Sequence, residues 1–162
     1  MSGREGSGHA AENTAAQKIE RQITVDASVE RVWSAISDHE QFGSWFRCVI
    51  ADPFVVGQTT QARSTSEGNE DSVFAILPKA MDQPHYFAFA WCAGNEKGAT
   101  DIENVPHTLV EFTIVARAGS CEVTICESGF ENLLEGDRDE YFRMNTEGWD
   151  AQAKNLKAHF AQ

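Results

Sequence analysis

The sequence predicts an α+β domain in which a curved antiparallel sheet packs against one long C-terminal helix. Segments within residues 19–25 and 54–127 alternate apolar and polar side chains with a period of two, which is typical of half-buried strands. Apolar side chains then recur at steps of three and four residues from Phe142 to Phe160, which is typical of a helix. Hairpins followed by a single terminal helix indicate an α+β fold.

The first ordered element is expected to be a strand over residues 19–25, followed by two short helices. Ser28 is a suitable N-cap for the first helix, because the apolar residues after it follow helical spacing. Asp38 begins a capping-box pattern for the second helix, which we expect over residues 39–42. Gly43 is interpreted as the signal that ends this helix.

About five strands are expected next, and then the long helix. The strands are predicted over residues 54–64, 72–77, 86–92, 109–116 and 121–127, with Pro78 closing the second of them. Gly119 lies in the short turn between the last two strands, which favours a hairpin. The terminal helix is predicted over residues 137–161, with Asp137 and Glu140 as its capping box.

Length and charge restrict the class of protein. The chain has 162 residues, which suits one domain, and a net charge of −12. A surface this negative repels nucleic acid and anionic membranes, and no segment approaches the roughly 20 apolar residues of a membrane span. We expect residues 1–17 to form a disordered polar tail and residues 18–162 to form the domain. The tail has no apolar leader, so the expected compartment is the cytoplasm.

No motif for a catalytic, cofactor or metal site is found. The four cysteines, Cys48, Cys92, Cys121 and Cys126, have no C-x-x-C spacing, and we interpret them as free thiols rather than disulfides. The five histidines are scattered singly. Nucleotide-binding glycine patterns and zinc-binding motifs are missing from the sequence. The sequence therefore assigns no cofactor, no metal and no catalytic residue.

Glu127 is the acidic residue with the most unusual position. Counting by twos along its strand, it shares a face with Val123 and Ile125. If those two side chains point to the interior, the Glu127 carboxylate does so as well and is desolvated. A functional interpretation makes Glu127 a proton donor or a polar anchor for a ligand. A structural interpretation places it at a rim reached by water, or pairs it with a base such as Arg143.

A long helix laid across a strongly curved sheet leaves a hollow between them, and such hollows are common ligand sites. Aromatic side chains would line it, and Asn145 and Trp149 would supply polar groups from the helix. Trp45 and Phe46, just after the second short helix, could instead form its mouth. The predicted ligand-binding residues are Trp45, Phe74, Phe87, Phe89, Trp91, Phe112, Glu127, Asn145 and Trp149.

Several segments resemble a known superfamily. The sequence Ala-Ser-Val-Glu-Arg-Val-Trp at residues 27–33 resembles the opening A-S-P-E-x-V-W motif of the START-like (SRPBCC) helix-grip superfamily. Residues 108–113, 127–130, 148–149 and 155–157 are similar to its branch named after the activator of the 90-kDa heat-shock protein ATPase. The resemblance covers residues 19–160 and implies a sheet gripping the terminal helix around an apolar cavity. The chain departs from the branch in having Val29 for proline and Gly57-Gln58 for a Gly-Gly pair.

These features leave three functional hypotheses. The first is a binding module whose internal hydrophobic cavity takes a small apolar or lipid-like ligand. The second, which the family name implies, is a co-chaperone-type regulator whose partner is a chaperone ATPase. The third is a cyclase or hydrolase that uses Glu127 or His85 for acid–base chemistry in the cavity.

Overall fold

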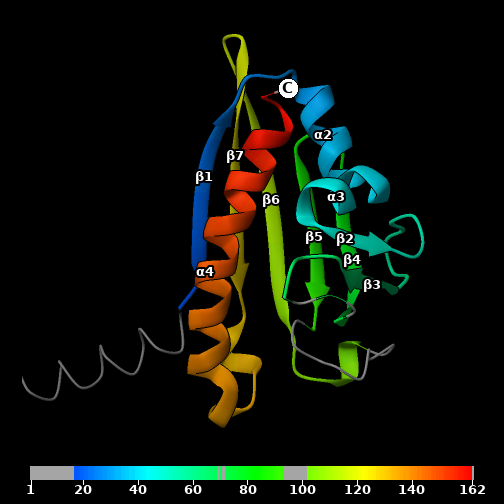
Figure 1. Cartoon of the computed structure of the whole chain (residues 1–162), viewed down its shortest axis with the longest axis vertical. Coiled ribbons are helices and arrows are strands. Elements are labelled where there is room, and N and C mark those ends of the chain that lie inside the picture. Colours follow the sequence, from blue (N-terminus) through cyan, green and yellow to red (C-terminus); the bar gives the residue numbers. More distant parts are fainter. Residues whose placement is uncertain (1–16, 69, 71, 93–101, 162) are drawn as a thin grey trace, which may run out of the picture.

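The computed structural model describes residues 17–68, 70, 72–92 and 102–161. Within them, a seven-stranded antiparallel sheet curves around the long helix α4, while α2 and α3 cover one end of the sheet (Figure 1). The strand order is β1-β7-β6-β5-β4-β3-β2. The predicted α+β class is confirmed, and the predicted disordered tail at residues 1–17 lies outside the described residues except for Gln17.

The elements follow one another along the chain as follows: β1 (Ile19–Val25), α2 (Val29–Ser37), α3 (His39–Phe46), β2 (Cys48–Ile50), β3 (Thr60–Ser64), β4 (Val73–Asp82), β5 (Tyr86–Trp91), the 3-10 helix η1 (Ile102–Asn104), β6 (Thr108–Arg117), β7 (Ser120–Ser128), the 3-10 helix η2 (Phe130–Asn132) and α4 (Glu135–His159). Most of the predicted elements are present. The differences lie at their ends and in the segment after α3.

The start of α2 and α3 agrees with the sequence, but the end of α3 does not. Ser28 caps α2 by accepting a hydrogen bond from the Arg31 amide, and Asp38 caps α3 through the Gln41 amide. The prediction that Gly43 ends α3 is wrong, because the helix continues to Phe46 and ends at Arg47 in the left-handed conformation (φ 71°). Glycine is needed at position 43 for a different reason. A Cβ atom there would lie 2.4 Å from the carbonyl oxygen of Cys48.

The sheet confirms the hairpin around Gly119 and corrects two predicted strands. Arg117 pairs with Ser120 across the turn, in which Gly119 has a φ of 77°. Of the predicted strand at residues 54–64, only Thr60–Ser64 is a strand, paired with β4 on one side and the unpredicted β2 on the other. Pro78 does not close β4, which continues to Asp82. Pairing with β3 stops at Ile76, and the pairing with β5 shifts register between Pro78 and Ala80, as expected where a proline lies in a strand.

Helix α4 begins two residues earlier than predicted and without the predicted capping box. Its N-cap is Leu134, which offers no capping side chain, so the pairing of Asp137 with Glu140 as a box is wrong. Arg138 instead donates to the carbonyl groups of Glu131 and Leu133 in the turn that leads into the helix, 3.3 Å from each. This contact orders the turn at the N-terminal end of α4.

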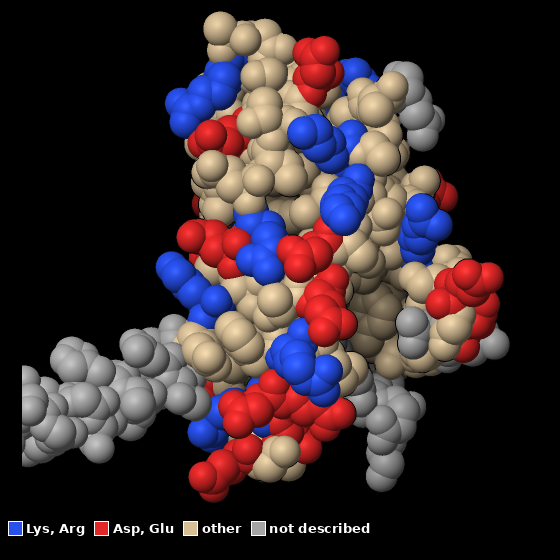
Figure 2. Space-filling model, turned by 60° about the vertical axis from the view of Figure 1, so that its left-hand side comes forward, with Lys and Arg blue, Asp and Glu red and all other residues tan. Residues whose placement is uncertain are grey.

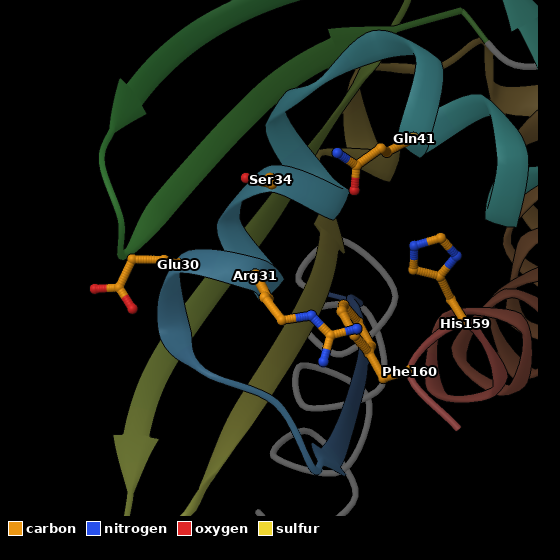
Figure 3. Close-up of a pocket in the computed structure, with 6 residues that line it drawn as sticks. All are labelled: Glu30, Arg31, Ser34, Gln41, His159 and Phe160. Atoms are coloured by element: carbon orange, nitrogen blue, oxygen red, sulfur yellow. The ribbon is translucent and has the colours of Figure 1, made fainter. Parts of the chain in front are cut away.

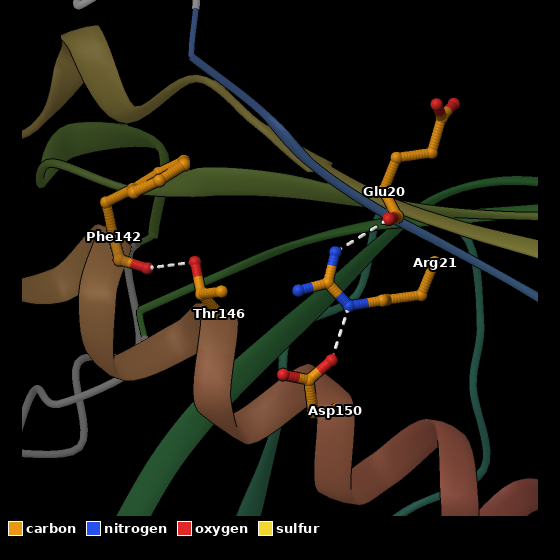
Figure 4. Close-up of polar contacts among 5 residues, drawn as sticks. All are labelled: Glu20, Arg21, Phe142, Thr146 and Asp150. Atoms are coloured by element: carbon orange, nitrogen blue, oxygen red, sulfur yellow. Dashed lines mark hydrogen bonds and ion pairs between the residues drawn. The ribbon is translucent and has the colours of Figure 1, made fainter.

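On its outer side, α4 is tied to the edge strand β1. The Arg21 guanidinium lies 2.6 Å from an Asp150 carboxylate oxygen and also donates to the Glu20 carbonyl (Figure 4). Thr146, one turn before Asp150, donates to the Phe142 carbonyl within the helix (Figure 4). Exposed ion pairs contribute at most about 1 kcal/mol. The contact therefore links α4 to β1 with only a small contribution to stability.

Two groups of apolar side chains form the core. The larger fills the space between the concave face of the sheet and the helices, and the smaller lies on the opposite face, where Ala75, Leu77, Ala90 and Cys92 pack against Ile102. All four cysteines lie in the described chain and are free thiols, and burial raises the pKa of the Cys48 thiol to about 12. Within the described residues, none of the helices combines the length and apolar character that a membrane span requires.

Replacing Gly43 by alanine is expected to destabilise the protein by about 2 kcal/mol. The clash with the Cys48 carbonyl outweighs the gain of about 1 kcal/mol that alanine brings to an ordinary helix, since the contact atom belongs to the backbone. Urea denaturation measures the difference. Gly148→Ala in α4 is the control, because its new Cβ meets no atom within 4 Å. It should gain about 1 kcal/mol, and equal stability of the two variants would contradict this account.

Candidate functional site

Glu127 is completely buried and accepts hydrogen bonds from four side chains. One carboxylate oxygen accepts from the Trp91 indole (2.9 Å) and the Thr108 hydroxyl (2.6 Å). The other accepts from the Trp149 indole (2.8 Å), and the Asn145 amide nitrogen lies 3.1 Å from both oxygens. The four donors come from β5, β6 and α4. One carboxylate therefore joins three elements to β7.

Local periodicity brings these five side chains together. Alternation along β7 turns Glu127 inward beside the buried Val123 and Ile125, as predicted. Trp91 and Thr108 are direct partners in the β5–β6 register, so both side chains reach the same point. Asn145 and Trp149 are four residues apart and share one face of α4.

The four donors that the described residues provide to Glu127 are all neutral. Arg143, the base considered from the sequence, is exposed and makes no ion pair with it. Among the described residues, no Lys, Arg or His side chain is paired with Glu127. Indole and amide N–H groups can only donate, so the carboxyl group serves them as an acceptor. Both of its oxygens accept hydrogen bonds from these side chains.

A pocket of about 100 Å³ lies beside this cluster, and we call it the rim pocket. It is lined by Phe46, Trp91, Asn145, Gly148, Trp149 and Gln152. The Gln152 amide donates to the Phe46 carbonyl (2.9 Å) and accepts from Asn155, which fixes its orientation. Three of the lining side chains, Trp91, Asn145 and Trp149, also bind Glu127. The buried carboxylate therefore determines the shape of the rim pocket.

The other predicted ligand-binding residues lie in the aromatic core. Phe87, Phe89 and Phe112 are buried and in mutual ring contact, with centroids 5.5–6.4 Å apart. Trp45 packs against Phe112 and donates its indole N–H to the Ala35 carbonyl. Phe74 is half-buried and contacts Phe46 and Trp91. In this part of the described chain, ring contacts occupy the space that we expected to be hollow.

The structure thus brings together four of the nine predicted residues: Trp91, Glu127, Asn145 and Trp149. Phe46, considered from the sequence as part of a mouth, does line the pocket. Thr108 and Gln152 were missed. Gln152 lies seven residues after Asn145, so helical spacing could have identified it. His85 is exposed at the far end of β5 from Trp91, with its ring nitrogen 3.0 Å from the Ile114 carbonyl oxygen, so it takes no part in the site.

A larger but more polar groove of about 340 Å³ lies between α2 and the end of α4 (Figure 3). The Arg31 guanidinium lies over the Phe160 ring, 5.6 Å from its centroid, and His159 faces Gln41 across the groove (Figure 3). Glu30 and Arg31 place opposite charges on its wall. Among the described residues, no group of three or more His, Cys, Asp or Glu side chains is arranged to hold a metal ion.

Comparison with known proteins identifies relatives by sequence profile and by fold. A family model described as Activator of Hsp90 ATPase homolog 1-like protein matches residues 26–161. No curated protein matches the sequence. Among solved structures, a protein from Arthrobacter aurescens is similar, with 17% identity, coverage of 91% of this chain and 88% of that one, and a TM-score of 0.75.

Two further solved structures are similar. The Aha1 dimer from Colwellia psychrerythraea has 13% identity, coverage of 89% of this chain and 96% of that chain, and a TM-score of 0.65. DynU16, from the dynemicin biosynthetic locus, has 19% identity and a TM-score of 0.66. The match covers 90% of this chain but 47% of DynU16, so the chain spans about half the length of that protein. At these identities, the likeness shows the fold alone.

Glu127→Gln is expected to destabilise the protein by at least about 1–3 kcal/mol. A glutamine amide presents an NH₂ group where the carboxylate accepted hydrogen bonds, so at least one buried donor loses its acceptor, at about 1–3 kcal/mol each. Urea denaturation measures the loss. Glu122→Gln on the same strand removes only the exposed pair with Arg117 and should cost less than about 1 kcal/mol. A similar loss of unfolding free energy in the two variants would show that the hydrogen bonds to Glu127 do not stabilise the fold.

Proposed function

The chain belongs to the Activator of Hsp90 ATPase homolog 1-like family, and on that premise we propose that it is a binding module for a small, mostly apolar ligand. The proposal rests on one observation. The rim pocket lies directly beside a buried, fully bonded carboxylate whose donors form its wall. Pockets that combine aromatic walls with a few fixed polar groups are the usual form of ligand sites.

The volume of the rim pocket restricts how a ligand would bind. At about 100 Å³, it offers the space that roughly three water molecules occupy in the liquid. Pockets that enclose a drug-sized molecule have about 300–1,000 Å³. A lipid-like ligand would therefore place one end in the rim pocket, and the rest would lie outside it. This replaces the enclosed cavity that we expected from the sequence as the place of binding.

Apolar contact would supply most of the affinity. The rings of Phe46, Trp91 and Trp149 form the wall and are each at least nine-tenths buried. A ligand that covers their remaining exposed edges gains about 25 cal/mol for each Å² of apolar surface removed from water. Asn145 and Gln152 supply the polar contacts that would orient it.

Filling the rim pocket with a side chain should abolish binding without disturbing the core. Gly148 lines the pocket, and a Cβ there meets no atom within 4 Å, so Gly148→Leu is expected to occupy it. Native mass spectrometry of the full chain against a panel of hydrophobic ligands, followed by titration of tryptophan fluorescence, measures binding. We expect at least a tenfold loss of affinity in Gly148→Leu.

The matched control for this test is Gly136→Leu. Gly136 is also exposed on α4 with open space around it, but it does not line the rim pocket. This variant should bind as the unmodified chain does. Absence of any bound ligand, or equal affinity in Gly148→Leu and Gly136→Leu, would refute the proposed function.

We propose regulation of a chaperone ATPase as the second candidate. The family description supports it. Val49 on the edge strand β2, and Val55 and Val56 after it, are exposed apolar side chains that would contact such a partner. This role would place the chain with its chaperone, in the cytoplasm that the sequence predicts.

An ATPase assay with the 90-kDa chaperone of the same organism tests the second candidate. Stimulation that is lost in a Val49→Glu, Val55→Glu double variant is the expected result, because the new charges oppose apolar contact. The rim-pocket variant Gly148→Leu should stimulate normally. No stimulation at saturating protein would reject this role.

A further inference from the structure

We infer that the rim pocket selects a ligand with a small organic cation at its end, such as an alkylated ammonium group. The inference rests on the proposed function and gives the chemical class of its ligand. Three features of the site support it: a buried carboxylate that pairs with no cationic side chain of the described residues, aromatic rings that meet at a corner, and amide groups held in one orientation.

The first feature is the Glu127 carboxylate, which lies behind the aromatic side chains that line the rim pocket. Glu127 is completely buried, and its hydrogen bonds come from neutral groups on Trp91, Thr108, Asn145 and Trp149. Among the described residues, no cationic side chain forms an ion pair with it. A buried carboxylate is normally compensated by a cation. Three of the side chains that bind Glu127 also line the rim pocket, so a cation bound there would lie next to groups that contact the carboxylate.

The second feature is the geometry of the aromatic wall. The Trp91 and Trp149 rings lie 5.7 Å apart at 32° to each other. Phe46 stands across both, 5.9 Å from Trp91 at 71° and 6.0 Å from Trp149 at 70°. The three rings therefore meet at a corner, and cations bind favourably within about 6 Å of a ring centroid. Both indole N–H groups donate to the carboxylate, which polarises the rings toward greater electron density.

The third feature is the orientation of the two amides that line the pocket. The Asn145 NH₂ group is directed to Glu127, so its carbonyl oxygen lies on the opposite side of the amide. The Gln152 NH₂ group is used by the Phe46 carbonyl. The Gln152 carbonyl oxygen accepts from the Asn155 amide, so of the two side chains it is Asn145 whose carbonyl oxygen can serve a ligand in the rim pocket as an acceptor. Acceptors and ring faces suit a cation and disfavour an anion.

The volume of the rim pocket and the net charge of the chain agree with this class of ligand. The volume of about 100 Å³ suits a compact head group such as trimethylammonium rather than a whole amphiphile. The chain carries a net charge of −12, which attracts cations over long distances. Acidic side chains are concentrated toward the end of the molecule where α4 begins, on the face in Figure 2.

A matched pair of probes tests the inference. Choline and its uncharged carbon isostere, 3,3-dimethylbutan-1-ol, have the same shape and differ in charge. Each is titrated into the ¹⁵N-labelled full chain at constant ionic strength, and the indole N–H signals of Trp91 and Trp149 are followed by NMR. We expect choline to bind at least tenfold more tightly than the isostere and to shift both signals. Gly148→Leu should abolish the shifts, and Gly136→Leu should retain them.

The outcomes separate the inference from the proposed function. Equal binding of choline and its isostere, or binding of only a neutral ligand from the hydrophobic panel, overturns the cation inference and leaves the binding function intact. Choline binding that Gly148→Leu does not weaken places the cation elsewhere and also overturns the inference. No binding of any probe or panel ligand overturns both. Because Glu127→Gln is expected to unfold more easily, the binding test uses the Gly148→Leu variant instead.

Discussion

The structure depends on satisfying one buried carboxylate. Glu127 lies on β7, and its four donors come from β5, β6 and α4. Each hydrogen bond to a charged group contributes about 1.5–3 kcal/mol, and an unmade one costs more. A slip of β7 by one residue would turn Glu127 to the outer face and remove the acceptor of the buried Trp149 indole and one of the two acceptors of the Trp91 indole. The cluster therefore fixes the register of the sheet and the position of α4 together.

The same cluster explains why the candidate site lies at the rim of the domain. The chain contains ten phenylalanines and four tryptophans, and most of them pack ring against ring between sheet and helices. Space remains where α3 ends, at Phe46, and where α4 has a glycine, Gly148, instead of a side chain. The rings that face this space are held from behind by Glu127. The Trp91 and Trp149 side chains thus stabilise the fold through Glu127 and also line the pocket proposed for a ligand.

Sequence periodicity predicted correctly which way side chains face within a single strand or helix. Alternation placed Glu127 inward, and helical spacing placed Asn145 and Trp149 on one face of α4, as the structure confirms. The partner of Glu127 was not predictable, because it depends on where α4 crosses the sheet, and that crossing brings indoles rather than Arg143 to the carboxylate. Gly43 shows the same limit of prediction from sequence. Its role is a close approach to the Cys48 carbonyl, a contact between backbone segments that no sequence pattern encodes. Whether rings fill a hollow also depends on sheet curvature and side-chain rotamers.

Hydrogen exchange of the indole N–H groups of Trp91 and Trp149 is the most direct test of the role assigned to Glu127. Both groups donate to the buried carboxylate, so they should exchange only when the whole domain unfolds. In a ¹H–¹⁵N NMR experiment, their exchange rates should then equal those of the slowest backbone amides of β7. Exchange of either indole that is orders of magnitude faster, with the β7 amides still protected, would show that the carboxylate does not hold the sheet and α4 together.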